Sequence, residues 1–207
     1  MRPVDLSVAA VRQALAGHRP RLLDADAHRK MAAVAAVLRE GAGGGELLFI
    51  HRAEHPADPW SGHMAFPGGR VEAGDAEPLA AAVRETREEV GLDLTASGTH
   101  LGRLSDVAAI GRGRPLPLVI APFVFALGEP LELTPNDEVQ EAVWVPLPFL
   151  ADRANRGTMR WRYRGLPVPL PCYRFEGRLI WGLTLKMVDE LLSCLAKRRP
   201  RPATLLL

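Results

Sequence analysis

The sequence predicts an α/β or α+β sandwich, in which helices pack against a sheet. Two observations support this fold class: several short segments have the pattern of strands, and a few amphipathic helices are interspersed among them. The chain has 207 residues, of which 47% are apolar and 24% are charged, which is enough for one domain with a substantial core. Its 19 glycines and 18 prolines indicate many turns between the elements.

The N-terminal half begins with a predicted docking helix over residues 4–16, whose apolar residues recur at helical spacing. Residues 31–38 and 46–52 are predicted to be apolar strands. The glycine-rich segment 41–45 separates them, so the two strands are expected to form a hairpin or near-hairpin. An irregular loop over residues 53–63 then leads into a glycine turn.

The C-terminal half is predicted to contain four strands, at residues 101–110, 116–127, 139–145 and 163–174. Pro122 lies inside the second of these strands, and this predicts either an edge strand or a bulge. A short helical turn is expected over residues 146–151. The last predicted element is an amphipathic helix over residues 180–196, where leucine and methionine recur every four residues.

The most informative stretch is a predicted acidic helix between Gly68 and Leu92. At about 100° per residue, Glu85, Glu88 and Glu89 share one face of this helix. The opposite face is expected to be buried and contains Leu79, Val83, Thr86 and Val90. Three carboxylates on one face repel one another, and a hard divalent cation with oxygen ligands would be their natural counter-charge.

The same stretch contains signals for the start and the end of the helix. Asp75 is the predicted N-cap, with Pro78 tolerated in the first turn, and Gly91 is in the position of a C-terminal stop. The preceding Gly68 and Gly69 allow the backbone to approach a phosphate or a metal closely. A solvated acidic face is the alternative interpretation, but loop, cap, carboxylates and stop together favour a functional site.

This stretch resembles the Nudix box, whose pattern is Gly, five residues, Glu, seven residues, Arg-Glu, an apolar residue, any residue, Glu-Glu, any residue, Gly, apolar. Residues 84–92 match its second half, with Thr86 at the apolar position. In the first half, Asp75 replaces the Glu, and eight residues rather than seven precede Arg84. That variant is similar to the coenzyme A pyrophosphatase branch. The resemblance implies the Nudix fold, an α/β/α sandwich with a central mixed sheet.

The resemblance also implies a pyrophosphohydrolase that uses Mg²⁺ or Mn²⁺ and acts on a nucleoside diphosphate linked to another moiety. A polyanionic substrate can approach acidic residues only if cations intervene between them. By the match, the metal ligands would be Glu85, Glu88, Glu89 and the backbone carbonyl of Gly69. Arg84 would orient these carboxylates; a simple salt bridge to Glu88, one turn later, is the other interpretation.

The general base of the implied reaction is expected outside the box. Many relatives place it on a loop before a late strand, and Glu138 occupies such a place here, with an ordinary loop carboxylate as the alternative. The catalytic set is therefore predicted to be Arg84, Glu88, Glu89 and Glu138. Glu141 is a lower-ranked candidate base, and Glu72 and Asp75 would either assist through water-mediated metal contacts or cap the helix.

The substrate is less well determined by the pattern. The coenzyme A branch carries an Arg, a His and a Ser before its glycine turn, and this chain has Asp58, Trp60 and Ala53 at those positions. The missing Arg would be a natural partner for a 3′-phosphate, which Asp58 would repel. Trp60 would either stack on an adenine or pack in the core. Residues expected to contact the substrate are Arg52, Trp60, Phe66 and Gly68.

Composition limits the partners and the compartment. The net charge of +2 is a weak argument for nucleic acid, so that partner is not expected. Cys172 and Cys194 lack metal-ligand spacing, which indicates reduced thiols in a cytoplasmic protein. The sequence has no signal peptide and no apolar run near 18 residues, so neither secretion nor membrane insertion is expected. One Nudix domain over residues 1–207 is expected, with a helical extension at 1–28 and a basic tail at 197–207; a homodimer is left open.

Several alternatives to a coenzyme A substrate stay open. Other hydrolase substrates would be dinucleoside polyphosphates, ADP-ribose, nucleotide sugars or a nucleoside triphosphate. A different class would be a non-catalytic Nudix module that binds a nucleotide or nucleic acid as a regulator. Degenerate boxes usually lose one of the three glutamates, whereas this sequence keeps Glu85, Glu88 and Glu89, and this favours the enzyme.

Overall fold

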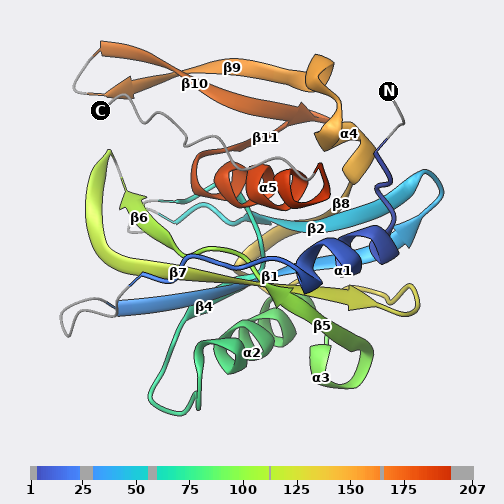
Figure 1. The fold of residues 1–207 in the computed structure, drawn as a ribbon. Helices are drawn as coiled ribbons and strands as arrows, with labels where there is room; N and C mark the ends of the chain where they lie inside the picture. Colours follow the sequence, from blue (N-terminus) through green and yellow to red (C-terminus); the bar gives the residue numbers. More distant parts are fainter. Residues whose placement is uncertain (1–3, 24–29, 56–59, 112, 164–165, 197–207) are drawn as a thin grey trace.

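A mixed sheet of eight strands forms the centre of the structure (Figure 1). The computed structural model describes residues 4–23, 30–55, 60–111, 113–163 and 166–196. The sheet comprises β1 (Lys30–Gly41), β2 (Gly44–Arg52), β3 (Met64–Ala65), β4 (Gly68–Arg70), β5 (Gly98–Arg103), β6 (Val107–Gly111), β7 (Arg114–Leu127) and β8 (Val139–Pro146). Their order is β3-β2-β1-β7-β5, with β4 beside β1, β6 beside β7 and β8 beside β2. The β1 and β7 strands run parallel, so the sheet is mixed.

Helices cover both faces of this sheet. On one side lie α2 (Pro78–Val90) and α3 (Leu94–Ser97), and on the other α1 (Val8–Ala16) and α5 (Gly182–Leu195) (Figure 1). The turns α4 (Leu147–Ala151) and η1 (Arg153–Asn155) lead to a three-stranded sheet beyond α5, made of β9 (Arg156–Tyr163), β10 (Leu166–Phe175) and β11 (Arg178–Trp181). The predicted α/β/α sandwich with a central mixed sheet is confirmed.

The apolar run of β1 is continuous because both of its faces are buried. Ala33, Ala35 and Val37 belong to the core cluster on the α2 side, and Ala36 and Leu38 to the cluster on the α5 side. The predicted hairpin is also present, since β1 and β2 pair antiparallel around a turn that begins with Gly41 opposite Gly44. The strand at 139–145 and the helical turn at 146–151 are found as β8 and α4.

The terminal helices are shorter than predicted. The first begins at Val8, because the side chain of Ser7 accepts a hydrogen bond from the amide of Ala10 at 3.2 Å and acts as the N-cap. The last begins at Gly182, because the preceding residues form β11. Residues 1–3, 24–29 and 197–207 lie outside the described residues, and so does Asp58. The basic tail and parts of the N-terminal extension therefore stay predictions.

The predicted strand at 101–110 is two strands, because β5 ends at Arg103 and β6 starts at Val107. In the break, the amide of Leu104 donates to the carbonyl of Pro122 at 2.9 Å. The β7 strand is internal, with β1 on one side and β5 and β6 on the other, so the expectation that Pro122 marks an edge is wrong. Proline is tolerated opposite a break in the ladder, where fewer backbone donors are needed.

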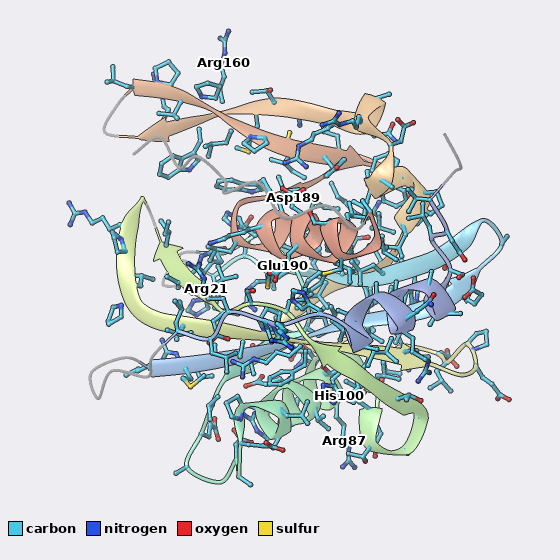
Figure 2. The ribbon with its side chains drawn as sticks, viewed as in Figure 1. Arg21, Arg87, His100, Arg160, Asp189 and Glu190 are labelled. Atoms are coloured by element: carbon cyan, nitrogen blue, oxygen red, sulfur yellow. The ribbon has the colours of Figure 1, made fainter. Side chains whose placement is uncertain are left out.

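The second sheet contains a strand that the sequence analysis missed, since β9 pairs with β10 along its whole length. Side chains alternate along a strand, and Arg160 points away from the molecule (Figure 2). Trp161 lies on the opposite face, with its ring centroid 6.4 Å from that of Trp181. The arginine and tryptophan of this segment therefore do not form one interleaved basic and aromatic surface.

The structure bears on the state of the two cysteines and on the predicted absence of a membrane-spanning helix. Cys172 and Cys194 are both free thiols. Burial raises the pKa of Cys194 to about 11, which keeps this thiol protonated at neutral pH. In the described part of the chain, none of the helices is long and apolar enough to cross a membrane.

Gly68 is expected to tolerate no side chain. Its φ is +150°, and a Cβ there would lie 2.2 Å from the carbonyl oxygen of Ala33. Gly68→Ala should lower the free energy of unfolding by about 3 kcal/mol, because both the backbone strain and the contact must be relieved. Chemical denaturation measures this. Gly74→Ala is the control, because its Cβ would meet no atom within 4 Å, and equal stabilities of the two variants would contradict the prediction.

Candidate functional site

Helix α2 presents its three glutamates beside β4, each in a different environment. Glu89 is only 2% exposed, Glu85 is half-buried, and the side chain of Glu88 is 55% exposed. The buried face expected from the sequence is therefore rotated around the helix. Leu79 and Val83 are only half-buried, whereas the fully buried residues are Ala81, Ala82, Thr86, Glu89 and Val90.

The carboxyl group of Glu89 is held inside the protein by one hydrogen bond and one longer ion-pair contact. The amide of Gly68 donates to Glu89 Oε2 at 2.7 Å, and Arg52 Nη1 lies 3.6 Å from Glu89 Oε1. Desolvation is the largest effect and raises the pKa of Glu89 to about 8, although both donors oppose this shift. The nearby charges of Glu85 and Glu138 raise the pKa further. A cation at this position would relieve the same penalty.

Glu85 lies directly over Gly69. A Cβ at Gly69 would be 2.2 Å from Glu85 Oε1, so a glycine is required for the carboxylate to occupy this place. Burial raises the pKa of Glu85, although Arg84 partly offsets the effect. The predicted glycine loop is in fact the short strand β4, which pairs antiparallel with β1. The two glycines therefore bring the sheet backbone into contact with the acidic helix.

Arg84 contacts three carboxylates and one backbone carbonyl in the exposed part of the site. Its guanidinium contacts Glu88 Oε2 at 3.2 Å, Glu85 Oε1 at 3.1 Å and Asp75 Oδ2 at 3.1 Å, and donates to the carbonyl of Arg70 at 3.1 Å. The contact with Glu88 is the i,i+4 salt bridge of the alternative interpretation, and the orienting role of Arg84 stays a prediction. One guanidinium holds three carboxylates and the end of β4 together.

Asp75 has a role that differs from the predicted N-cap. Helix α2 starts at Pro78, so the N-cap position belongs to Glu77, whose side chain makes no capping hydrogen bond. Asp75 instead accepts from Arg84 and from the amide of Glu72 at 2.8 Å, and the hydrogen bond from Arg84 lowers the pKa of Asp75. The aspartate of the variant box thus holds the arginine in place.

The loop that carries Glu138 is attached to the C-terminal end of α2. The amides of Thr134 and Asn136 donate to the carbonyls of Val90 and Glu89 at 2.9 and 3.0 Å, which satisfies two of the last carbonyl groups of the helix. The helix ends at Gly91 with φ +72°, as predicted. Glu138 is exposed, and its charge raises the pKa of both Glu85 and Glu89, so it lies close to the site.

Two of the residues predicted to contact the substrate, Phe66 and Gly68, make structural contacts within the protein. Phe66 is 1% exposed and packs on Phe49 at a ring-centroid distance of 5.1 Å, so it lies in the core, and its predicted contact with the substrate stays a prediction. The amide of Gly68 donates to Glu89 and is not available to a substrate. Trp60 is half-buried, and its indole donates to the carbonyl of Ile110 at 3.1 Å, which attaches this loop to β6.

The donor set of the site suits a hard divalent cation, because every candidate ligand is an oxygen. The carboxylates are not drawn together into a finished cage: within the described ranges, no three His, Cys, Asp or Glu residues are grouped so that they could hold a metal ion. Glu85 and Glu89 nevertheless converge on the two glycines of β4. Their burial and mutual repulsion are the kind of cost that a bound cation offsets.

Comparisons with known proteins agree with the fold. A family model described as the NUDIX domain matches residues 29–163. The chain is 30% identical over 195 residues to the mitochondrial coenzyme A diphosphatase NUDT8 of Homo sapiens, covering 92% of this chain and 79% of that protein. The uncharacterized protein C14C4.10c of Schizosaccharomyces pombe is 38% identical over 104 residues, but this match covers 49% of the chain and spans only 32% of that protein.

A crystal structure of a MutT/nudix family protein from Enterococcus faecalis has the same fold. Its TM-score is 0.54 at 18% identity, with 92% of this chain and 69% of that chain covered. At this level of identity the likeness concerns the fold alone. The fold, the family model and the human relative together support the resemblance that residues 84–92 indicate.

Without metal, the Glu89 carboxyl should make stability depend on pH. Its folded pKa of about 8 exceeds the reference value of 4.5, so the folded state retains a proton that the unfolded state releases. The stabilisation is fully present below pH 4.5 and is lost as the pH rises towards about 8. Glu89→Gln should therefore stabilise the protein by about 1–4 kcal/mol at pH 8 in EDTA.

Urea unfolding in EDTA from pH 5 to pH 9 measures this effect. Glu88→Gln is the control, because an exposed side chain in the same helix should change stability by no more than about 0.5 kcal/mol. If Glu89→Gln is as pH-dependent as the parent protein, Glu89 is not the buried acid.

Proposed function

We propose that this chain, which belongs to the Nudix family, is a metal-dependent pyrophosphohydrolase that cleaves the diphosphate of coenzyme A or a close derivative. The observation that carries the substrate class is the likeness to a coenzyme A diphosphatase, at 30% identity over 92% of the chain. The retained acidic trio on α2 favours an enzyme over a binding module.

In this proposal Glu85, Glu88, Glu89 and the carbonyl of Gly69 hold Mg²⁺ or Mn²⁺. When bound, such a cation neutralises charge on the pyrophosphate and lowers the pKa of a coordinated water. Arg84 keeps Glu85 and Glu88 in place through its contacts at 3.1 and 3.2 Å. The amide of Gly68 fixes the buried carboxylate of Glu89 from the sheet side.

Glu138 is the proposed general base. Its carboxylate is exposed, while its backbone is fixed at both ends: its amide donates to Asn136 Oδ1 at 2.9 Å, and its carbonyl accepts from the amide of Ala53 at 2.8 Å. A carboxylate in this place can take the proton of an attacking water. Arg52, beside Glu89, is positioned to balance negative charge at the reacting diphosphate.

The substrate experiment compares coenzyme A, 3′-dephospho-coenzyme A, ADP-ribose, a diadenosine polyphosphate and a nucleoside triphosphate by initial rate with Mg²⁺ and Mn²⁺. We expect one of the two coenzyme A forms to be cleaved at least about tenfold faster than the other three compounds. Because Asp58 and Trp60 replace the expected Arg and His, a preference for the dephospho form would locate the change in that loop. Glu88→Gln, purified in parallel, controls for contaminating hydrolases. Absence of hydrolysis in all five would favour the regulatory module.

Glu138→Gln should lower kcat by about 10²–10⁴-fold, because the amide cannot accept a proton. The acidic limb of the pH–rate profile should change with it, while KM should stay similar. Asp137→Asn removes the neighbouring carboxylate of the same exposed loop and is the matched control, expected to keep kcat within about twofold. Equal kcat values for the two variants would remove Glu138 from the role of base.

A further inference from the structure

A β-bulge in the β2–β8 ladder lies beside the proposed active site. The pairing runs regularly to His51 opposite Glu141, but Arg52 is opposite Val139, so Gln140 is an extra residue. Because side chains alternate along a strand, one extra residue reverses which face the following side chains meet. Bulges are common next to active sites, where they re-aim a side chain.

Two residues of the proposed active site lie next to this bulge. Arg52, on one strand, is directed to Glu89 at 3.6 Å. Glu138 is the turn residue immediately before β8, and its carbonyl accepts a hydrogen bond from the amide of Ala53 at 2.8 Å, next to the bulge. A regular register would place a different residue opposite Arg52. The catalytic geometry therefore depends on what holds the bulge in place.

A bidentate salt bridge is attached at the last regular pair. Arg178 on β11 donates from Nε and Nη2 to the two carboxylate oxygens of Glu141, both at 2.6 Å. Its remaining nitrogen Nη1 contacts the carbonyl of Glu176 at 3.2 Å and the carboxylate of Glu176 at 3.1 Å, so the β10–β11 turn braces the guanidinium. Because the planar guanidinium of Arg178 is bonded on both sides, it fixes the orientation of the Glu141 carboxylate as well as neutralising its charge.

His51 extends this contact to the loop before β3. Its Nε2 lies 3.1 Å from the carbonyl of Gly62, and its buried Nδ1 faces Glu141 Oε1 at 3.5 Å. Both ring nitrogens thus face oxygen acceptors. Through these contacts the Glu141 carboxylate joins β2, β8, β11 and the Gly62 loop at one point.

We propose that Glu141, held by Arg178 and facing His51, is a positioning residue that fixes the β2–β8 bulge and thereby aims Arg52 and Glu138 at the metal-site carboxylates. This inference rests on the proposed function. Glu141 touches no reacting atom, and its own carboxylate is fully engaged by Arg178, so it acts through the register of the strands.

A simple salt bridge between layers is the competing explanation, and the chain contains a matched example. Arg156 of β9 makes a bidentate contact with Asp189 of α5, with Nη2 and Oδ2 2.8 Å apart. Both bridges anchor the second sheet and have similar side-chain exposure, 22% and 35% for Arg178 and Glu141 against 33% and 39% for Arg156 and Asp189. Only the first is attached to a bulge.

The test compares Glu141→Gln with Asp189→Asn in the full chain. Hydrogen exchange followed by mass spectrometry should show faster exchange in peptides covering residues 50–54 and 136–142 for Glu141→Gln. Asp189→Asn should leave those peptides unchanged. With the coenzyme A form that the protein cleaves best, kcat of Glu141→Gln should fall by about 10–100-fold, the range for groups around a metal site that hold its residues in place, with KM little changed.

A double-mutant cycle separates positioning from general stability. Because Glu141 is proposed to act through both Arg52 and Glu138, Glu141→Gln should lower kcat by a smaller factor in an Arg52→Ala background than in the parent protein. Additive effects, unchanged exchange at the bulge, or an equal loss of kcat in Asp189→Asn would overturn the proposal. Arg178→Gln repeats the test from the other side if Glu141→Gln folds poorly. If the parent protein cleaves no substrate, the proposed function fails, while the exchange data still decide whether Glu141 holds the bulge.

Discussion

The buried carboxylate of Glu89 is the constraint on which the rest of the site depends. An ionised group removed from water is costly unless donors or a cation compensate it. The structure supplies an amide from Gly68 and a guanidinium from Arg52, yet burial still raises the pKa to about 8. The strand β4 must therefore lie close to α2, and only glycine allows that approach. In the proposed metal site, Glu89 would be an oxygen ligand whose desolvation a divalent cation offsets.

The three glutamates of α2 differ in exposure, and each is held by different contacts. Glu89 is anchored to the sheet, Glu85 lies over Gly69, and the exposed Glu88 is restrained by Arg84. Arg84 is itself held by Asp75, so the aspartate that departs from the common box pattern has a physical function. Eight residues separate Asp75 from Arg84, one more than in the common box, and the shorter acidic side chain still contacts this arginine.

Local sequence patterns predicted many of the helices, strands and turns, but they could not predict contacts between residues far apart in the chain. The β1–β2 hairpin, the acidic helix and its stop at Gly91 follow from periodicity and glycine placement. The core position of Phe66 did not, because a motif does not reveal which of its members serve packing. The break between β5 and β6 also carries no local signal: Arg103 pairs with Asp106, which accepts from the amide of Leu23, 83 residues earlier. The contact of Glu141 with Arg178 spans 37 residues and has no sequence signature.

The family model ends at residue 163, whereas the salt bridge that reaches the bulge starts at Arg178. Helix α2 and the central sheet lie within the region that the family model matches, whereas the salt bridge from Arg178 to Glu141 joins that region to the second sheet. If Glu141 acts as proposed, a change in the second sheet can alter the alignment of Arg52 and Glu138 while the three glutamates of α2 stay the same. Differences in substrate preference among relatives should then be sought in the contacts of β11 as well as in the box.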